Sequence, residues 1–204
     1  MNKIKRWQFS IGFILLIALT NYQFAKLIQR ITLHFFPSFS YQLALIIPWF
    51  LIAIIPIIFL KSFEELKVDF EAIKKNILEI VLICGLVTVG LLFFVFTGIT
   101  KYFHSVQYPL IFFIATPIIE ELMFRGWMFT KLQKLNLYPI FGTSLLFGLH
   151  HLQYFRYMPT PFALFQITYT FFLGLLFARL RQKSGIVYIS ILMHIFINWV
   201  TVSF

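Results

Sequence analysis

The stretch that decides the fold of this chain is Pro117-Ile118-Ile119-Glu120-Glu121-Leu122-Met123-Phe124-Arg125. It places two carboxylates and a guanidinium directly after an uncharged run that begins at Tyr102. A charged side chain at the centre of a bilayer costs about 3 kcal/mol even on the lenient insertion scale. Two of the seven acidic residues of the chain lie in this stretch. We therefore expect these charges to serve a purpose inside an apolar segment.

Helical spacing predicts which of these charges meet. Glu121 and Arg125 are four residues apart, so they share a helix face and are expected to form an ion pair. Glu120 points about 100° away, toward a different neighbour. A carboxylate without a charged partner in a low-dielectric site can act as a general base near neutral pH. The stretch is also compatible with an ion pair that only fixes helix packing, or with a carboxylate in a proton relay.

The composition predicts a membrane protein. The chain has 204 residues, of which 60% are hydrophobic and only 12% are charged, and its mean hydropathy is +0.88. A soluble domain carries about twice this fraction of charge. Most uncharged runs reach the roughly 20 residues that a spanning helix needs. The predicted fold class is all-α: a polytopic transmembrane helical bundle with about seven spans and one amphipathic helix on the membrane surface.

The positive charge is explained by topology. The net charge is +10, but the 17 Lys and Arg residues are scattered over short gaps between apolar runs and form no contiguous patch. We therefore expect no nucleic-acid partner. Most of these cations fall on one side if the N-terminus is cytoplasmic, which the positive-inside rule favours. The chain is predicted to be an integral protein of a bacterial plasma membrane, with its first apolar run an uncleaved anchor. Cys84 is the single cysteine, so no internal disulfide is possible.

The chain divides into two predicted parts. Residues 1–108 hold the N-terminal spans, 7–25, 41–60 and 77–98, with an amphipathic connector, 61–76, between the second and third. Residues 109–204 are predicted to form the catalytic core. Its expected spans are 109–134, 138–152, a sixth that runs from a turn at 159–161 to about residue 178, and 186–204. Arg179, Arg181 and Lys183 are predicted to form a basic turn closed by Gly185.

Two of the expected core spans carry further polar residues. In the run before residue 152, Phe147 and His151 are four apart and share a face, while His150 is expected to face elsewhere. Gly148 removes a side chain and lets another backbone come close. In the last span, His194 and Asn198 lie one turn apart. A single histidine in a membrane helix is often a hydrogen-bonded core residue, but histidines on two helices with a nearby glutamate predict a polar chamber that holds water.

These residues resemble the three motifs of the CPBP intramembrane proteases, a family that includes the CAAX prenyl endopeptidases and the bacterial Abi or bacteriocin-processing and self-immunity proteins. The resemblance covers about half the chain, residues 109–204, and implies an all-helical fold with its site inside the membrane. It also implies roles for the motif residues. Glu120 with His151 would activate a water, His194 with Asn198 would stabilise the oxyanion, and Glu121, Arg125 and Phe147 would support them.

The residues leave open whether that mechanism uses a metal ion. A glutamic mechanism requires no cofactor. The same side chains, Glu120, His151 and His194, are also the ligand types that hold a zinc ion with a bound water. The sequence does not separate a metal-free glutamic protease from a metalloprotease.

The expected partners are the lipid bilayer and a peptide or protein substrate that enters from the membrane. Processing or self-immunity of a bacterial peptide or protein fits the resemblance, and a leader peptide, a pheromone precursor or a membrane protein is a more plausible substrate than a prenylated one. Two other functions stay open from the residues alone. One is a non-catalytic immunity or binding protein of the membrane, and the other is a proton-coupled transporter, although no inverted repeat is visible.

Overall fold

The computed structural model describes residue 27 and residues 30–37, 69–97, 110–156 and 159–203. All regular structure in these ranges is helical, as the composition predicts. The predicted spans at 7–25 and 41–60, and residues 61–68 of the predicted amphipathic helix, lie outside the described residues. The elements beyond residue 69 are α3 (Phe70–Lys75), α4 (Ile77–Phe96), α5 (Leu110–Glu121), η3 (Leu122–Met128), α6 (Phe129–Lys134), α7 (Pro139–His150), η4 (His151–Arg156), α8 (Thr160–Ser184) and α9 (Tyr188–Ser203).

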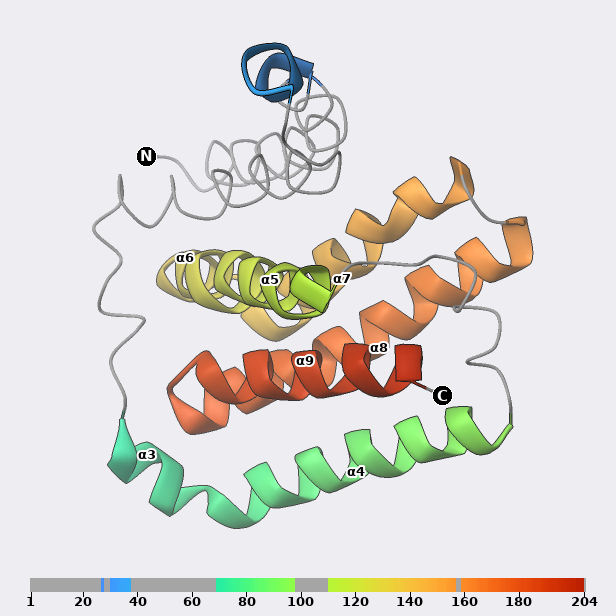
Figure 1. The fold of residues 1–204 in the computed structure, drawn as a ribbon. Helices are drawn as coiled ribbons and strands as arrows, with labels where there is room; N and C mark the ends of the chain where they lie inside the picture. The colour runs from blue at the N-terminus through green and yellow to red at the C-terminus, as the bar shows by residue number, and fades with distance from the viewer. Residues whose placement is uncertain (1–26, 28–29, 38–68, 98–109, 157–158, 204) are drawn as a thin grey trace.

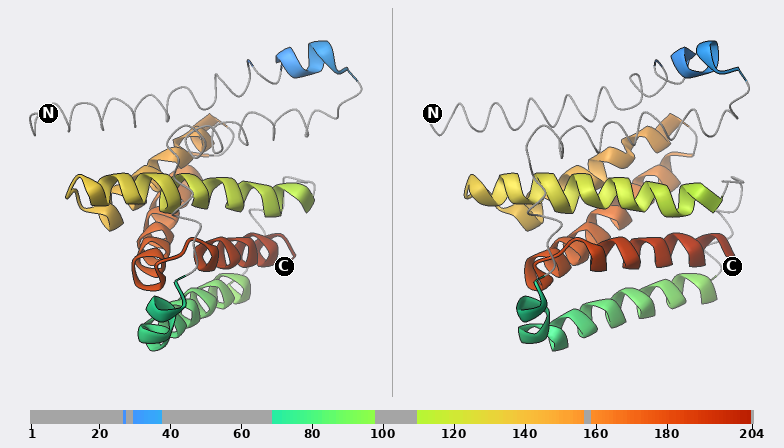
Figure 2. Two further views of the ribbon diagram at one scale, coloured as in Figure 1. Left: turned by 90° about the vertical axis from the view of Figure 1, so that its left-hand side faces the viewer. Right: turned by 60° about the vertical axis from the view of Figure 1, so that its left-hand side comes forward.

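Helix α9 lies at the centre of this arrangement. It runs beside α5 on one side and beside α4 on the other, and α8 crosses behind it (Figures 1 and 2). Helix α7 packs along α8, which makes the most extensive helix pair of the described residues. The α5, η3 and α6 segments follow one another along one axis, and together they form a continuous helical rod over residues 110–134. The rod with the acid pair is therefore flanked by the two helices that carry the histidines.

Helix α4 shows how one apolar helix faces two environments. Its buried residues, Ile80, Ile83, Val87 and Leu91, recur at helical spacing and pack on α8 and α9. The opposite face is also apolar, and its side chains are 60–71% exposed: Leu78, Leu82, Leu86, Val89 and Phe93. A soluble helix would carry polar residues there, so this face is suited to lipid.

Helix α8 is the one described helix that is long and apolar enough to cross a membrane, with 25 residues. Shorter apolar helices occupy Ile77–Phe93, Pro139–His150 and Tyr188–Thr201. The predicted total of about seven spans stays a prediction, because the N-terminal segments lie outside the described residues.

Both ends predicted for the sixth span are corrected by the structure. Thr160 and Pro161 belong to the first turn of α8 and not to a preceding turn, because proline is tolerated where a helix has no hydrogen-bond partner for its N–H. The helix also continues through the cations to Ser184 and ends at Gly185, whose φ of 72° is the left-handed conformation that glycine adopts easily. Cations are favourable in the last turn of a helix. The predicted basic turn is therefore the last turn of α8.

Those cations also fasten α8 to the start of α4. Glu79 lies 2.7 Å from Arg179 Nε and 2.8 Å from Lys183 Nζ. Arg181 points the other way and donates from Nε to the carbonyl oxygen of Arg125, at 3.1 Å. The end of α8 is thus tied to α4 and to the rod that carries the acid pair.

Candidate active site

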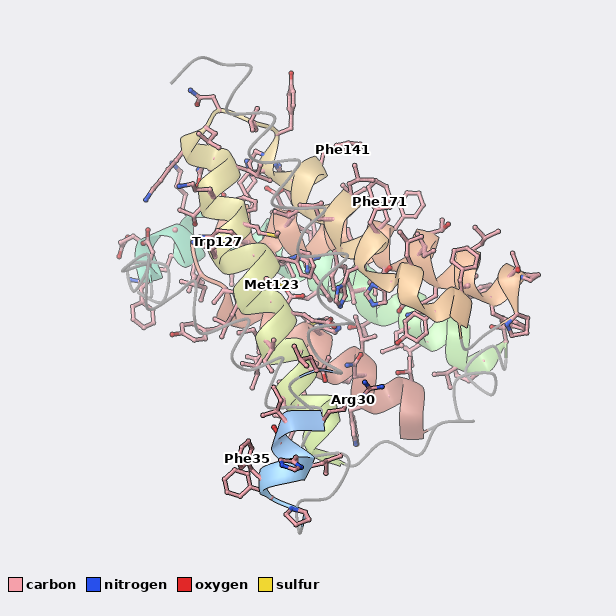
Figure 3. All side chains as sticks on the ribbon, turned by 90° about the horizontal axis from the view of Figure 1, so that it is seen from above. Arg30, Phe35, Met123, Trp127, Phe141 and Phe171 are labelled. Atoms are coloured by element: carbon pink, nitrogen blue, oxygen red, sulfur yellow. The ribbon has the colours of Figure 1, made fainter. Side chains whose placement is uncertain are left out.

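The acid pair ends α5 at a change of helix type. Glu120 and Glu121 are the last two residues of α5, and residues 122–128 form a π-helix. Short π-helical segments are rare and often occur at functional sites. Pro117 lies within α5 and has no N–H to donate to the preceding turn. Figure 3 shows Met123 and Trp127 along this part of the rod. Sequence spacing gave no sign of the π-helical segment.

The structure brings Glu121 and Arg125 together, as their spacing predicts. Arg125 donates to Glu121 Oε1 at 3.0 Å, and both side chains are fully buried. The rest of the guanidinium is surrounded by aromatic rings. Its carbon lies 4.3 Å from the centre of Phe147, 5.4 Å from Phe177 and 5.8 Å from Phe124. A cation over a desolvated aromatic face is stabilised by the ring quadrupole. Phe147 therefore supports the site by covering Arg125.

His194 joins the two glutamates. Its Nδ1 lies 3.0 Å from Glu121 Oε1, and its Nε2 lies 3.8 Å from Glu120 Oε2. An ionised carboxylate only accepts hydrogen bonds, so opposite an ionised Glu121 the proton of a neutral His194 lies on Nδ1. In the neutral ring Nε2 then has a lone pair, and His194 donates from Nε2 only as an imidazolium. One oxygen of Glu121 thus serves both Arg125 and His194, which makes Glu121 the link between the guanidinium and the imidazole.

Glu120 has imidazole partners on two other helices, so the prediction that this carboxylate is free is wrong. The residue is 6% exposed. Its Oε1 lies 3.6 Å from His150 Nε2, on α7, and its Oε2 lies 3.8 Å from His194 Nε2, on α9. Both distances are slightly longer than a direct hydrogen bond, a separation at which water often bridges two polar groups. The predicted polar chamber included His194 but not His150, because helical spacing describes only neighbours on the same helix.

The two adjacent histidines are arranged differently from the prediction. His150 was expected to face elsewhere, but it is buried and lies nearer to Glu120 than His151 does. His151 places Nδ1 2.7 Å from the carbonyl oxygen of Phe147, and its ring stacks on Tyr154 at 5.7 Å. These contacts fix the ring of His151 beside His150, with centroids 5.4 Å apart. Tyr154 was not predicted to belong to the site, because the prediction followed four-residue α-helical spacing, whereas the 3₁₀-helix η4 brings residues three apart together.

Asn198 lies one turn after His194 on α9 and is partly exposed. The hydrogen bond described at this residue is one that its carbonyl oxygen accepts from Thr201, at 3.0 Å. The predicted role of its amide at an oxyanion stays a prediction.

The possible metal ligands are not arranged as a metal site. Within the described ranges, no group of three His, Cys, Asp or Glu side chains has the geometry to hold a metal ion. Of the three predicted ligands, His194 already engages Glu121 through Nδ1, and His151 engages Phe147. These contacts leave Nε2 of both histidines available, as in many metal-binding histidines, so metal dependence stays a question for experiment.

Two glycines bring α7 and α8 close enough to form this site. A Cβ on Gly148 would lie 3.0 Å from the carbonyl oxygen of Ile167, which confirms that this glycine admits a second backbone. A Cβ on Gly174 would lie 3.0 Å from Ser144 Cα and 3.2 Å from Arg125 Nη2. The aromatic pair Phe141 and Phe171, with centres 5.9 Å apart, spans the same interface (Figure 3).

Comparison with known proteins gives one match. Residues 102–200 match the family model described as type II CAAX prenyl endopeptidase, Rce1-like. The match contains all the residues of the site, from Glu120 to Asn198, and the resemblance drawn from the three motifs is confirmed. No curated protein and no solved structure gives a significant match to the chain. The predicted division at residue 108 stays a prediction.

Proposed function

We propose that this protein is an intramembrane endopeptidase that hydrolyses a peptide bond with a water activated by Glu120, because residues 102–200 match the family model of Rce1-like type II CAAX prenyl endopeptidases. The observation that carries the proposal is the position of Glu120. It is a buried carboxylate whose two oxygens each face an imidazole from a different helix. Burying a carboxylate in an apolar segment costs free energy, so its presence there indicates a functional role.

The proposed reaction needs only groups of this chain and one water. Glu120 takes a proton from the water as its oxygen attacks the carbonyl carbon of the substrate, and the carbonyl electron pair moves onto oxygen. His151, held by Phe147 and Tyr154, helps to orient that water. The C–N bond then breaks, and the leaving nitrogen takes the proton from Glu120. The products are a carboxylic acid and an amine, which become a carboxylate and an ammonium group by proton transfer in water. A positioned base of this kind contributes roughly 10²- to 10⁴-fold to the rate.

The oxyanion of the intermediate requires donors. We assign this role to His194 as an imidazolium and to Asn198, following the family motif. The contact of His194 Nδ1 with Glu121 supports this assignment, because it directs Nε2 toward Glu120 and the reacting centre. A donor already aimed at developing charge in a site without bulk water contributes about 3 kcal/mol. Glu121 and Arg125 act through His194 and are positioning residues.

The substrate is proposed to be a bacterial peptide or membrane protein that reaches the site from the bilayer, in processing or self-immunity. The exposed apolar face of α4 supports a membrane location. We propose a plasma membrane with the N-terminus in the cytoplasm, and the charge distribution along the sequence supports that orientation.

The experiment uses the full chain, purified and reconstituted in liposomes, with a panel of quenched peptides. The panel includes leader peptides and C-terminal CAAX peptides with and without a prenyl group. Glu120→Gln is expected to abolish cleavage, while Glu71→Gln, on the exposed helix α3, is expected to leave it unchanged. Cleavage that persists in Glu120→Gln contradicts the mechanism. If no peptide is cleaved and cellular function survives Glu120→Gln, a non-catalytic binding protein is the better description.

The same assay decides the metal question. Each active peptide is tested with and without a chelator, followed by addition of zinc. Activity that is insensitive to the chelator supports the glutamic mechanism. Activity that is lost and then restored by zinc assigns the site to a metalloprotease.

A further inference from the structure

His150 occupies a position that the family motif leaves unassigned. It ends α7, and the chain tightens into a 3₁₀-helix from His151 onward. The two histidines are consecutive, yet both are buried at 7% exposure, with their rings at 88° to each other. The ring of His150 also meets the edge of Phe124, with centres 5.7 Å apart. The change of helix type lets the last turn of α7 present two imidazoles to the interior.

The nitrogen of His150 faces the base of the proposed reaction. His150 Nε2 lies 3.6 Å from Glu120 Oε1, and His194 Nε2 lies 3.8 Å from the other oxygen of the same carboxylate. A buried carboxylate requires such partners, because an ion without them is expensive in an apolar interior. The two imidazoles come from α7 and α9, so together they hold the carboxylate from both sides.

We propose that His150 is a further positioning residue of this site: its Nε2 holds Oε1 of Glu120 and so fixes the direction from which the carboxylate meets the attacking water. The proposal rests on the proposed function and deepens it. It assigns different roles to the two adjacent histidines. His150 orients the base, while His151, whose Nδ1 is engaged by Phe147, is left to contact water or substrate with its other nitrogen.

A packing role for His150 predicts a different result from a positioning role. Packing requires the ring, which fills the space beside Phe124. Positioning requires a nitrogen donor close to Glu120. His150→Phe keeps a ring and removes the nitrogen, whereas His150→Gln removes the ring and keeps an N–H donor near the place of Nε2. A packing role therefore predicts that His150→Gln is the more harmful variant, whereas a positioning role predicts that His150→Phe is the more harmful one.

Steady-state cleavage by the full chain in liposomes tests the proposal, with the peptide that the wild type cleaves best. We expect His150→Phe to lower kcat by about tenfold or more with KM within about twofold, because a misdirected base slows chemistry and not binding. We expect His150→Gln to stay within about threefold of the wild-type kcat. Leu149→Phe, at an exposed position of the same helix turn, serves as the matched control and should leave both constants unchanged. Full kcat in His150→Phe, or equal losses in both variants, overturns the proposal.

A second measurement keeps the test independent of catalysis. Reversible unfolding in mixed detergent micelles is measured for His150→Phe, Glu120→Leu and the double variant. Residues in direct contact give non-additive effects, so we expect the double variant to depart from additivity by about threefold or more in the unfolding equilibrium constant. Additive effects overturn the proposed contact. If the wild type cleaves no peptide, the proposed function fails, and this cycle still decides whether His150 holds Glu120.

Discussion

The buried pair of Glu121 and Arg125 allows a quantitative prediction, because its two members are fully buried and joined at 3.0 Å. Arg125→Leu removes the cation and leaves the carboxylate in the apolar interior. Breaking a buried ion pair from one side costs about 3–5 kcal/mol. The cost for Arg125→Leu is expected toward the upper end of this range, because the contact between the guanidinium and Phe147, at 4.3 Å, is lost as well. The unfolding equilibrium constant is expected to rise roughly a hundredfold to a few thousandfold.

The double variant Glu121→Leu/Arg125→Leu is expected to be more stable than Arg125→Leu alone. Replacing both members of a buried pair with apolar residues is often close to neutral. The remaining cost is about 1–3 kcal/mol, because His194 Nδ1 loses the acceptor that lies 3.0 Å away. Activity, in contrast, should not return, since Glu121 no longer orients His194. Stability and activity are therefore expected to separate in the double variant.

The assay is reversible unfolding by SDS in mixed micelles, with peptide cleavage measured on the same preparations. Lys131→Leu, an exposed position on α6 of the same rod, is the control for loss of a cation. The reasoning is refuted if Arg125→Leu costs no more than Lys131→Leu. It is also refuted if the effects of the two leucine substitutions simply add.

Three further predictions follow from the packing, the surface and the motif. Gly174→Ala brings a Cβ to 3.0 Å from the α7 backbone, so it should cost about 1–3 kcal/mol in unfolding and reduce cleavage, whereas Gly85→Ala, with nothing within 4 Å, should do neither. Glu79→Gln removes two ion pairs at the end of α8, so it should lower the unfolding midpoint at low salt, with a smaller difference at high salt and unchanged cleavage; the control is Glu71→Gln. Asn198→Ala should lower kcat by about 10²- to 10³-fold with little change in KM if its amide meets the oxyanion, and steady-state kinetics measures both.

Local sequence was informative where the interacting groups lie on the same helix. The pairing of Glu121 with Arg125 depends only on a four-residue separation, and the close approach at Gly148 depends only on a missing side chain. Spacing failed at a change of helix type and at contacts between helices. His150 turned inward where the α-helix of α7 gives way to 3₁₀ turns. The predicted end of the sixth span was too early because the cations of α8 find partners on α4 and η3.

The amino-acid sequence by itself determined that this chain is a helical membrane protein and that Glu120, His151 and His194 lie in three motifs that resemble those of one family, since these depend on composition and on short spacings. Only the tertiary structure decided which groups touch. His194 is shared between both glutamates, His150 faces Glu120, and three aromatic rings enclose Arg125. The reason is geometric: these partners come from α5, α7, α8 and α9, and their contacts depend on how the helices rotate and cross, which no local pattern in the chain encodes.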